Sequence, residues 1–124
     1  MKITAVILAS MMLASCASLP SISFYDDNES LLAVQVRGAA ESLDCSAKQE
    51  PQVKGIQNRV DLLLYFSEAK HSDDVQEMVL PMKETVDSFY ARIRKNDSIA
   101  FCELKKKIII QQSKTIADAV MRRF

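Results

Sequence analysis

Tryptophan is absent from this 124-residue chain, histidine occurs once, and glycine and proline are scarce, at two and three residues. All-β sandwiches and barrels need many tight turns, for which glycine and proline are the usual residues, so their scarcity argues against both folds. Basic and acidic residues balance at sixteen each, which gives no reason to expect nucleic acid as a partner. Apolar residues make up 48% of the chain, enough for one folded domain.

Residue combinations that carry catalysis or bind metals are also missing. The single histidine, His71, stands before Ser72 and two aspartates, an order typical of a turn followed by a helix start. The chain contains no HExxH sequence, no glycine-rich phosphate loop and no EF-hand spacing. The sequence therefore predicts a protein that is not an enzyme and that has no cofactor or metal site.

The N-terminus has the layout of a secretory signal. Lys2 provides a positive charge, residues 3–13 form an apolar run, and the small residues Ala14 and Ser15 follow it. At about 1.5 Å per residue the run is too short to cross the hydrocarbon core of a bilayer, so it does not predict a stable transmembrane helix. We expect residues 1–15 to be a signal peptide that is removed on export.

The residues around Cys16 extend this interpretation. Leu13-Ala14-Ser15-Cys16 resembles the lipobox of bacterial lipoproteins, in which an aliphatic residue, a small residue and Gly, Ala or Ser precede an invariant Cys. The resemblance implies a diacylglycerol on the Cys16 thiol, cleavage before Cys16, and an acyl chain such as palmitate on the new amine. Because Ala17 rather than Asp follows, it also implies the periplasmic side of a Gram-negative outer membrane. Two or three fatty chains make such anchoring effectively permanent.

A short segment separates this anchor from the folded domain. Residues 17–28 have no helical period and contain Ser, Pro and paired Asp, so we expect a lipidated tether over 16–28 and a helical domain over 29–124. Fully extended, the twelve residues 17–28 reach at most about 40 Å. The tether therefore keeps the domain close to its membrane.

Charged residues are unevenly placed along the chain. Acidic residues predominate between Asp26 and Glu50, and basic residues predominate in the last twenty positions. We interpret these regions as two solvated faces; a basic surface turned toward anionic lipid headgroups is the alternative. Residues 105–107 are consecutive lysines that cannot all face one way, so one of them must run its methylene stem along apolar surface.

Four later stretches have the 3.6-residue period of amphipathic helices, at residues 30–44, 52–70, 72–95 and 99–124. Each stretch places apolar residues along one face, which we expect to form the core. In chain order these residues are Leu32, Val36, Ala39 and Leu43; Val53, Ile56, Val60, Leu63 and Leu64; Val75, Met78, Val79, Met82, Val86, Phe89, Tyr90 and Ile93; and Cys102, Ile109, Ile116 and Val120, with Phe101, Leu104 and Ile108 widening the last face.

The ends of these helices are predicted less uniformly than their interiors. Asn28 and Ser72 are the expected N-caps of the first and third helices, and Asn96-Asp97-Ser98 is expected to end the third helix and cap the fourth, since such side chains can accept hydrogen bonds from free first-turn amides. Apolar and polar residues alternate near the start of the first stretch, so a short strand there is an alternative. Pro81 either kinks a single third helix or begins a new one, and the unbroken apolar register favours the kink.

Two cysteines remain once Cys16 carries lipid. Cys45 and Cys102 are an even pair in an oxidising compartment. In a bundle whose helices alternate in direction, the first helix ends at the level where the fourth begins, which brings both residues to one end. The sequence therefore predicts a small all-α, four-helix up-down bundle with a Cys45–Cys102 disulfide. Two unpaired thiols or a redox-active pair are the alternatives, although catalytic pairs normally lie close in sequence.

These expectations combine into a functional hypothesis. The chain is an outer-membrane lipoprotein whose helical domain faces the periplasm as a non-enzymatic binding or structural module, with the membrane and an unidentified envelope protein as partners. The alternative is a small periplasmic inhibitor, immunity or exclusion lipoprotein directed against a toxin, phage or conjugative element. That alternative rests on analogy between small helical folds.

Overall fold

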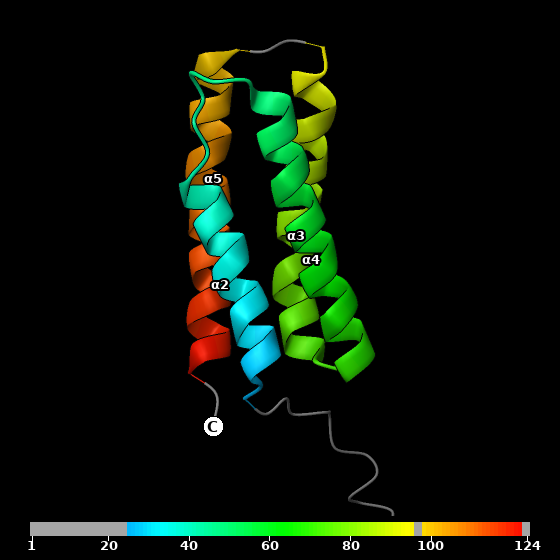
Figure 1. Cartoon of the computed structure of the whole chain (residues 1–124). Coiled ribbons are helices and arrows are strands. Elements are labelled where there is room, and N and C mark those ends of the chain that lie inside the picture. The colour runs from blue at the N-terminus through cyan, green and yellow to red at the C-terminus, as the bar shows by residue number, and fades with distance from the viewer. Residues whose placement is uncertain (1–24, 96–97, 123–124) are drawn as a thin grey trace, which may run out of the picture.

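A computed structural model describes residues 25–95 and 98–122, which form four helices and no strand within those ranges. The helices are α2 (Asp27–Glu41), α3 (Gln49–Lys70), α4 (Asp73–Ile93) and α5 (Ile99–Met121). Successive helices run in opposite directions and close a ring, because α2 packs on α3, α3 on α4, α4 on α5 and α5 on α2 (Figure 1). The predicted four-helix up-down bundle is confirmed, and a strand in the first stretch is wrong.

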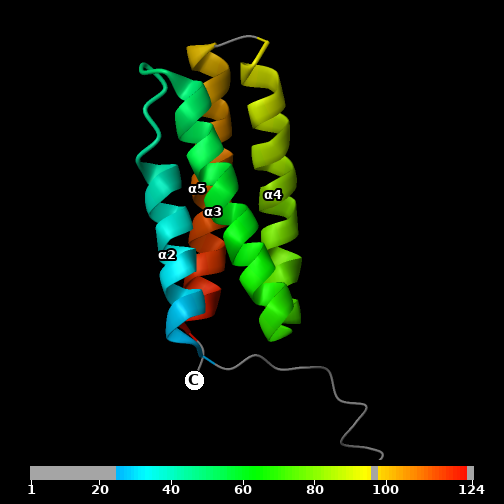
Figure 2. The ribbon, with the colours of Figure 1, turned by 45° about the vertical axis from the view of Figure 1, so that its right-hand side comes forward.

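None of these four helices is long and apolar enough to span a membrane. The start of α2, the α3–α4 turn and the end of α5 lie at one end of the bundle, which we call the proximal end (Figures 1 and 2). At the opposite, distal end lie the α2–α3 loop, the end of α4 and the start of α5. The chain therefore enters and leaves the bundle at the proximal end.

The first helix begins earlier than its sequence pattern predicts. Asp26 is the N-cap of α2, and its carboxylate accepts hydrogen bonds from the amides of Asn28 and Glu29 at 2.8 and 3.1 Å. Asn28, the expected cap, lies in the first turn, so residues 27–28 belong to the helix and not to the tether. A carboxylate is favoured at the cap because it also suits the positive end of the helix dipole.

Proline has a different effect in α3 and α4. α3 begins three residues before the predicted start at position 52, so Pro51 lies in its first turn, where amides have no intrahelical partner and the missing N–H of proline costs little. α4 continues through Pro81, so a new helix beginning there is wrong. Pro81 is on the exposed side of α4, where solvent reaches the Glu77 carbonyl that loses its partner.

A tight turn joins α3 to α4. His71 ends α3 in the left-handed conformation, with φ at 61°, and its amide donates to the Glu68 carbonyl at 3.2 Å. The prediction of His71 as a turn residue is confirmed. Ser72 is the N-cap of α4, as expected, but its hydroxyl makes no capping hydrogen bond. That part of the prediction is wrong because Ser72 is buried with ψ at 76°, away from the extended conformation usual for a capping residue.

The core fills the space between the helices, and the predicted stripes of α3 and α4 are confirmed. In the first stretch Val36 and Leu43 are buried as predicted, whereas Ala33 and Ala40 are buried in place of their neighbours Leu32 and Ala39, which are only partly buried. Apolar residues surround α2 on almost every side, so periodicity alone does not fix which face turns inward. The largest fully buried apolar side chains are Phe89, Leu43, Ile56, Leu63, Met82, Ile109 and Ile116.

The last helix differs most from its sequence pattern. Its N-cap is Ser98, the last of the three residues predicted to provide a cap, and the Ser98 hydroxyl accepts a hydrogen bond from the Phe101 amide at 3.3 Å. Phe101 is half-buried, but Leu104 and Ile108 are 57% and 38% exposed, so they do not widen the buried face. Small side chains at Ser113 and Ala117 are buried in this helix instead. Leu104 and Ile108 therefore belong to the surface of the bundle.

Candidate functional site

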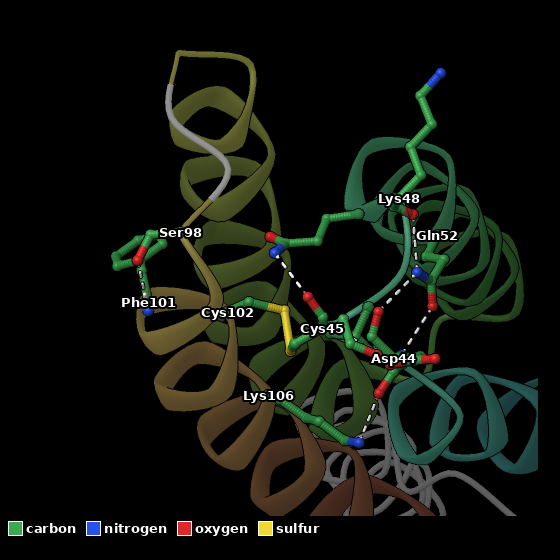
Figure 3. Close-up of a disulfide and its surroundings, with 11 residues drawn as sticks. Asp44, Cys45, Lys48, Gln52, Ser98, Phe101, Cys102 and Lys106 are labelled. Atoms are coloured by element: carbon green, nitrogen blue, oxygen red, sulfur yellow. Dashed lines mark hydrogen bonds between the residues drawn. A yellow bond between two sulfur atoms is a disulfide. The ribbon is translucent and has the colours of Figure 1, made fainter.

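The distal end is held together by a disulfide between Cys45 and Cys102 (Figure 3). Cys45 lies in the α2–α3 loop and Cys102 in the first turn of α5, and their Cα atoms are 5.7 Å apart. Both residues are buried. The predicted pairing is confirmed, and two unpaired thiols are wrong. The bond joins the α2–α3 loop to α5 across 57 positions of the sequence.

The α2–α3 loop climbs beside α5 because α2 is a short helix. α2 has 15 residues against 23 in α5, so the loop covers the distal part of the core (Figures 1 and 2). Leu43 and Cys45 from the loop are buried there. Lys106 donates to the Leu43 carbonyl at 2.6 Å, and the buried Gln49 side chain donates to the Cys45 carbonyl at 3.2 Å. Lys106 is half-buried, as expected for one of the three consecutive lysines.

Side-chain hydrogen bonds fix the exposed part of the same loop (Figure 3). Asp44 accepts from the hydroxyl and amide of Ser46 at 2.6 and 3.0 Å, and these two bonds lower the pKa of its carboxyl. Gln52 accepts from the Asp44 amide at 2.8 Å and donates to the carbonyls of Asp44 and Lys48 at 2.9 and 2.8 Å. These hydrogen bonds therefore fix the backbone of the loop beside the disulfide.

Charge is strongly polarised along the bundle. Among the described residues, the distal segments 42–54, 89–95 and 98–107 contain eight basic and three acidic residues, whereas the proximal segments 25–30, 66–77 and 113–122 contain three and eight. The distal basic residues are Lys48, Lys54, Arg92, Arg94, Lys95, Lys105, Lys106 and Lys107. The charges therefore separate by end, and the interpretation as two faces is wrong. The distal ends of α3 and α4 add basic residues to those at the start of α5, and their proximal ends add acidic residues to those at the start of α2.

Ion pairs lie elsewhere in the molecule. Lys70 approaches Glu29 and Asp26 at 3.6 and 3.9 Å at the proximal end, and Lys83 pairs with Asp61 and Asp87 at 2.9 and 3.0 Å near the middle. The eight distal cations form no ion pair with any carboxylate of the described residues. Lys106 donates instead to the Leu43 carbonyl and Lys54 to the Gln57 side chain, so the other six are the cations that no polar group of the described residues engages.

Aromatic rings hold some of these cations in place. The guanidinium of Arg92 lies 4.2 Å from the centroid of the Phe101 ring, and the Lys105 amine lies 5.5 Å from the same centroid. The Phe101 ring in turn meets the buried Phe89 ring edge to face, with centroids 5.8 Å apart. Each exposed cation–ring contact contributes about 0.5–1 kcal/mol. The core thus fixes the ring, and the ring orients two cations from different helices.

A second ring carries a similar but partly neutralised group. The Lys54 amine and the Arg94 guanidinium lie 5.1 and 5.9 Å from the centroid of the Tyr90 ring. The Tyr90 hydroxyl donates to the Glu50 carboxylate at 3.4 Å, and Lys54 also donates to the Gln57 side chain. A carboxylate of the chain already lies beside this ring, so the Phe101 ring is the more open of the two.

Exposed apolar residues continue the helix stripe on which Phe101 lies. Phe101, Leu104, Lys105 and Ile108 follow the spacing i, i+3, i+4, i+7, which puts them along one stripe of α5. We call these four residues together with Arg92 of α4 the Phe101 patch. Sequence reasoning assigned Leu104 and Ile108 to the core and so missed this surface. A signal for it exists in the crowding of lysines at 105–107, which limits how much of that helix turn can be buried.

His71 does not contribute to this surface. Cys16, the predicted lipid attachment point, lies outside the described residues. His71 is exposed at the proximal end, and no group of three or more potential metal ligands occurs in residues 25–95 and 98–122. No protein family, curated protein or solved structure matches this chain. The geometry of the distal end is therefore the basis for a functional proposal.

The first prediction concerns the disulfide. On the chain-entropy account, closing a loop of this length contributes about 4 kcal/mol of stability. Even half of that value would lower the melting temperature by roughly 8 °C or more in a domain of this size. We expect Cys45→Ser, Cys102→Ser and the double variant to show the same drop, because all three remove one link.

Calorimetry with and without reductant measures this effect. Reductant should lower the melting temperature of the wild type to that of the variants and leave the variants unchanged. Mass spectrometry of the alkylated, non-reduced protein that found two free thiols at Cys45 and Cys102 would contradict the pairing.

Proposed function

We propose that this protein is an outer-membrane lipoprotein whose helical domain is a non-enzymatic binding module of the cell envelope. The observation that carries the binding part is made at the distal end, where Arg92 and Lys105, which have no ion-pair partner among the described residues, lie against the Phe101 ring on the stripe that also carries exposed apolar side chains. Protein interfaces combine these features, with apolar and aromatic residues at the centre and charged residues at the rim. The partner is a protein of the envelope.

The relative position of anchor and binding surface supports this proposal. Cys16 precedes the helix cap Asp26 by ten residues, and Asp26 lies at the proximal end. Since α3 has 22 residues, the distal end is about 33 Å from the proximal end at 1.5 Å per residue. A lipid on Cys16 would hold the acidic end near the membrane and present the basic end away from it. The distal surface then meets partners in the periplasm.

The ordered distal end also suits binding. The disulfide, the Gln52 hydrogen bonds and the Phe89–Phe101 contact fix the surface before any partner arrives. Association then costs less conformational entropy, because fewer side chains must be immobilised.

The anchor itself gives the second prediction. Cys16→Ala removes the thiol that would receive the diacylglycerol, so we expect this variant to accumulate as an unprocessed or soluble exported form. The wild type should partition into the detergent phase and carry labelled palmitate. Equal partitioning of both proteins, with no label on the wild type, would contradict lipidation.

The third prediction concerns the destination of the lipoprotein. With Ala17 after the modified cysteine, the wild type should sediment with outer-membrane markers on a sucrose gradient. Ala17→Asp should shift it toward inner-membrane fractions, since Asp at this position is the retention signal in the resembled family. Recovery of the wild type with inner-membrane markers would contradict the proposed location.

The fourth prediction tests binding in intact cells. A photoreactive amino acid at Leu104 or Ile108 should give a discrete adduct with one envelope protein on irradiation, because both side chains lie in the proposed surface. Leu62 is the matched control, since it is 51% exposed on α3 and outside the patch. Adducts of the same size and yield from position 62, or none from positions 104 and 108, would contradict a binding role for the distal end.

A further inference from the structure

We propose that the Phe101 patch binds a protein segment that combines carboxylates with apolar side chains, such as an acidic amphipathic helix. This inference deepens the proposed function and rests on it for one point, that the partner is a protein of the cell envelope. The chemistry of the partner follows from the five residues of the patch: Arg92 on α4, and Phe101, Leu104, Lys105 and Ile108 on α5.

Arg92 is prepared to bind a carboxylate. Its guanidinium, at 4.2 Å from the Phe101 centroid, is supported by the ring and forms no ion pair with a described carboxylate. A guanidinium supported in this way loses little rotamer freedom when its planar fork of N–H donors pairs with a carboxylate. Lys105 places a second positive charge near the same ring, and an anion between the two cations relieves their mutual repulsion.

The apolar part of the patch determines which kind of anion fits. Leu104 and Ile108 are 57% and 38% exposed, one helical turn apart, on the stripe that also carries Lys105. A sugar or phosphate polymer would pair with the cations but would leave these two side chains in water. A peptide that presents apolar and acidic residues together buries the former and pairs with the latter. Arginine and aromatic residues at the centre of such a contact are typical of strong binding positions.

A lipid surface fits the patch less well. Membrane-surface helices insert free aromatic or aliphatic side chains between headgroups. The Phe101 ring is held against the buried Phe89 and covered by Arg92, so it is not free to insert. If Cys16 is lipidated, bringing the distal end onto the same membrane requires the ten residues between Cys16 and the bundle to span its full length of about 33 Å. That distance is close to the full extension of the tether, about 36 Å.

The test is a binding measurement on the full chain purified in a non-ionic detergent. The probe is a fluorescent twenty-residue helical peptide of Glu and Leu, with all Leu on one face, followed by anisotropy. We expect Arg92→Glu, Lys105→Glu and Leu104→Ser each to raise the dissociation constant by about tenfold or more. Polyglutamate, which lacks apolar side chains, should bind the wild type at least about tenfold more weakly and should not respond to Leu104→Ser.

Matched controls separate this site from general electrostatics. Lys114→Glu makes the same charge change on α5 outside the patch, and Leu62→Ser makes the same polarity change on α3; both should change the dissociation constant by less than about threefold. Circular dichroism and melting curves confirm that each variant is folded, which the exposure of Leu104 and Arg92 favours.

Four results would overturn the inference. They are no binding of the acidic peptide by the wild type, an equal loss in Lys114→Glu, tighter binding to phosphatidylglycerol vesicles with the same variant sensitivity, and sedimentation showing self-association that the patch variants abolish. The last two would assign the patch to a membrane or to a second copy of the chain. Cys16→Ala should bind the peptide as the wild type does, so a failure of the anchor and a failure of the patch are distinguishable.

Discussion

The cross-link between Cys45 and Cys102 is the constraint on which the distal end depends. Because α2 is shorter than the other helices, its end of the core has to be covered by a loop, and a loop contributes few packed side chains of its own. The disulfide ties that loop to α5, and the Lys106 and Gln52 hydrogen bonds fix it on either side. Because the loop is anchored in this way, the start of α5 is held in place, and so are the residues around Phe101.

The polarised charge is not a requirement of the fold. Exposed ion pairs contribute little to stability, and gathering eight cations at one end adds repulsion without adding burial. Among the described residues, ion pairs lie at the proximal end and along the middle, whereas the distal cations contact aromatic rings, uncharged oxygen atoms or solvent. Such an arrangement is explained by binding more readily than by folding. The cluster of charges also raises the association rate with a partner of opposite charge. This effect weakens as the salt concentration rises, because salt screens the attraction.

Helix interiors could be predicted from the sequence, whereas their ends and rotations could not. The apolar stripes are regular over about three turns in α3 and about five in α4, so the 3.6-residue period fixes their inward faces. α2 is apolar nearly all round, and its rotation is decided by contacts with α3 and α5. Its start depends on a local competition in which the carboxylate of Asp26 captures the first amides before Asn28 does. For α5 the sequence placed the cap within Asn96-Asp97-Ser98, since all three residue types favour helix starts, and the structure shows that the Ser98 hydroxyl accepts from the Phe101 amide.

Composition and periodicity by themselves determined the all-α class and its four helical stretches, because each stretch carries its own 3.6-residue period. The alternating direction of such helices brings Cys45 and Cys102 to one end, so the sequence favoured the disulfide over free thiols. The sequence also carries the lipobox resemblance, which lies outside the described residues. Only the tertiary structure decided the candidate site. The Phe101 patch contains residues of two helices, Arg92 of α4 and Lys105 of α5 among them. The antiparallel packing of these helices brings the two cations together, and a local sequence pattern does not predict that packing. Whether Leu104 and Ile108 are core or surface depends on how far α4 covers α5, which is a property of the assembled bundle.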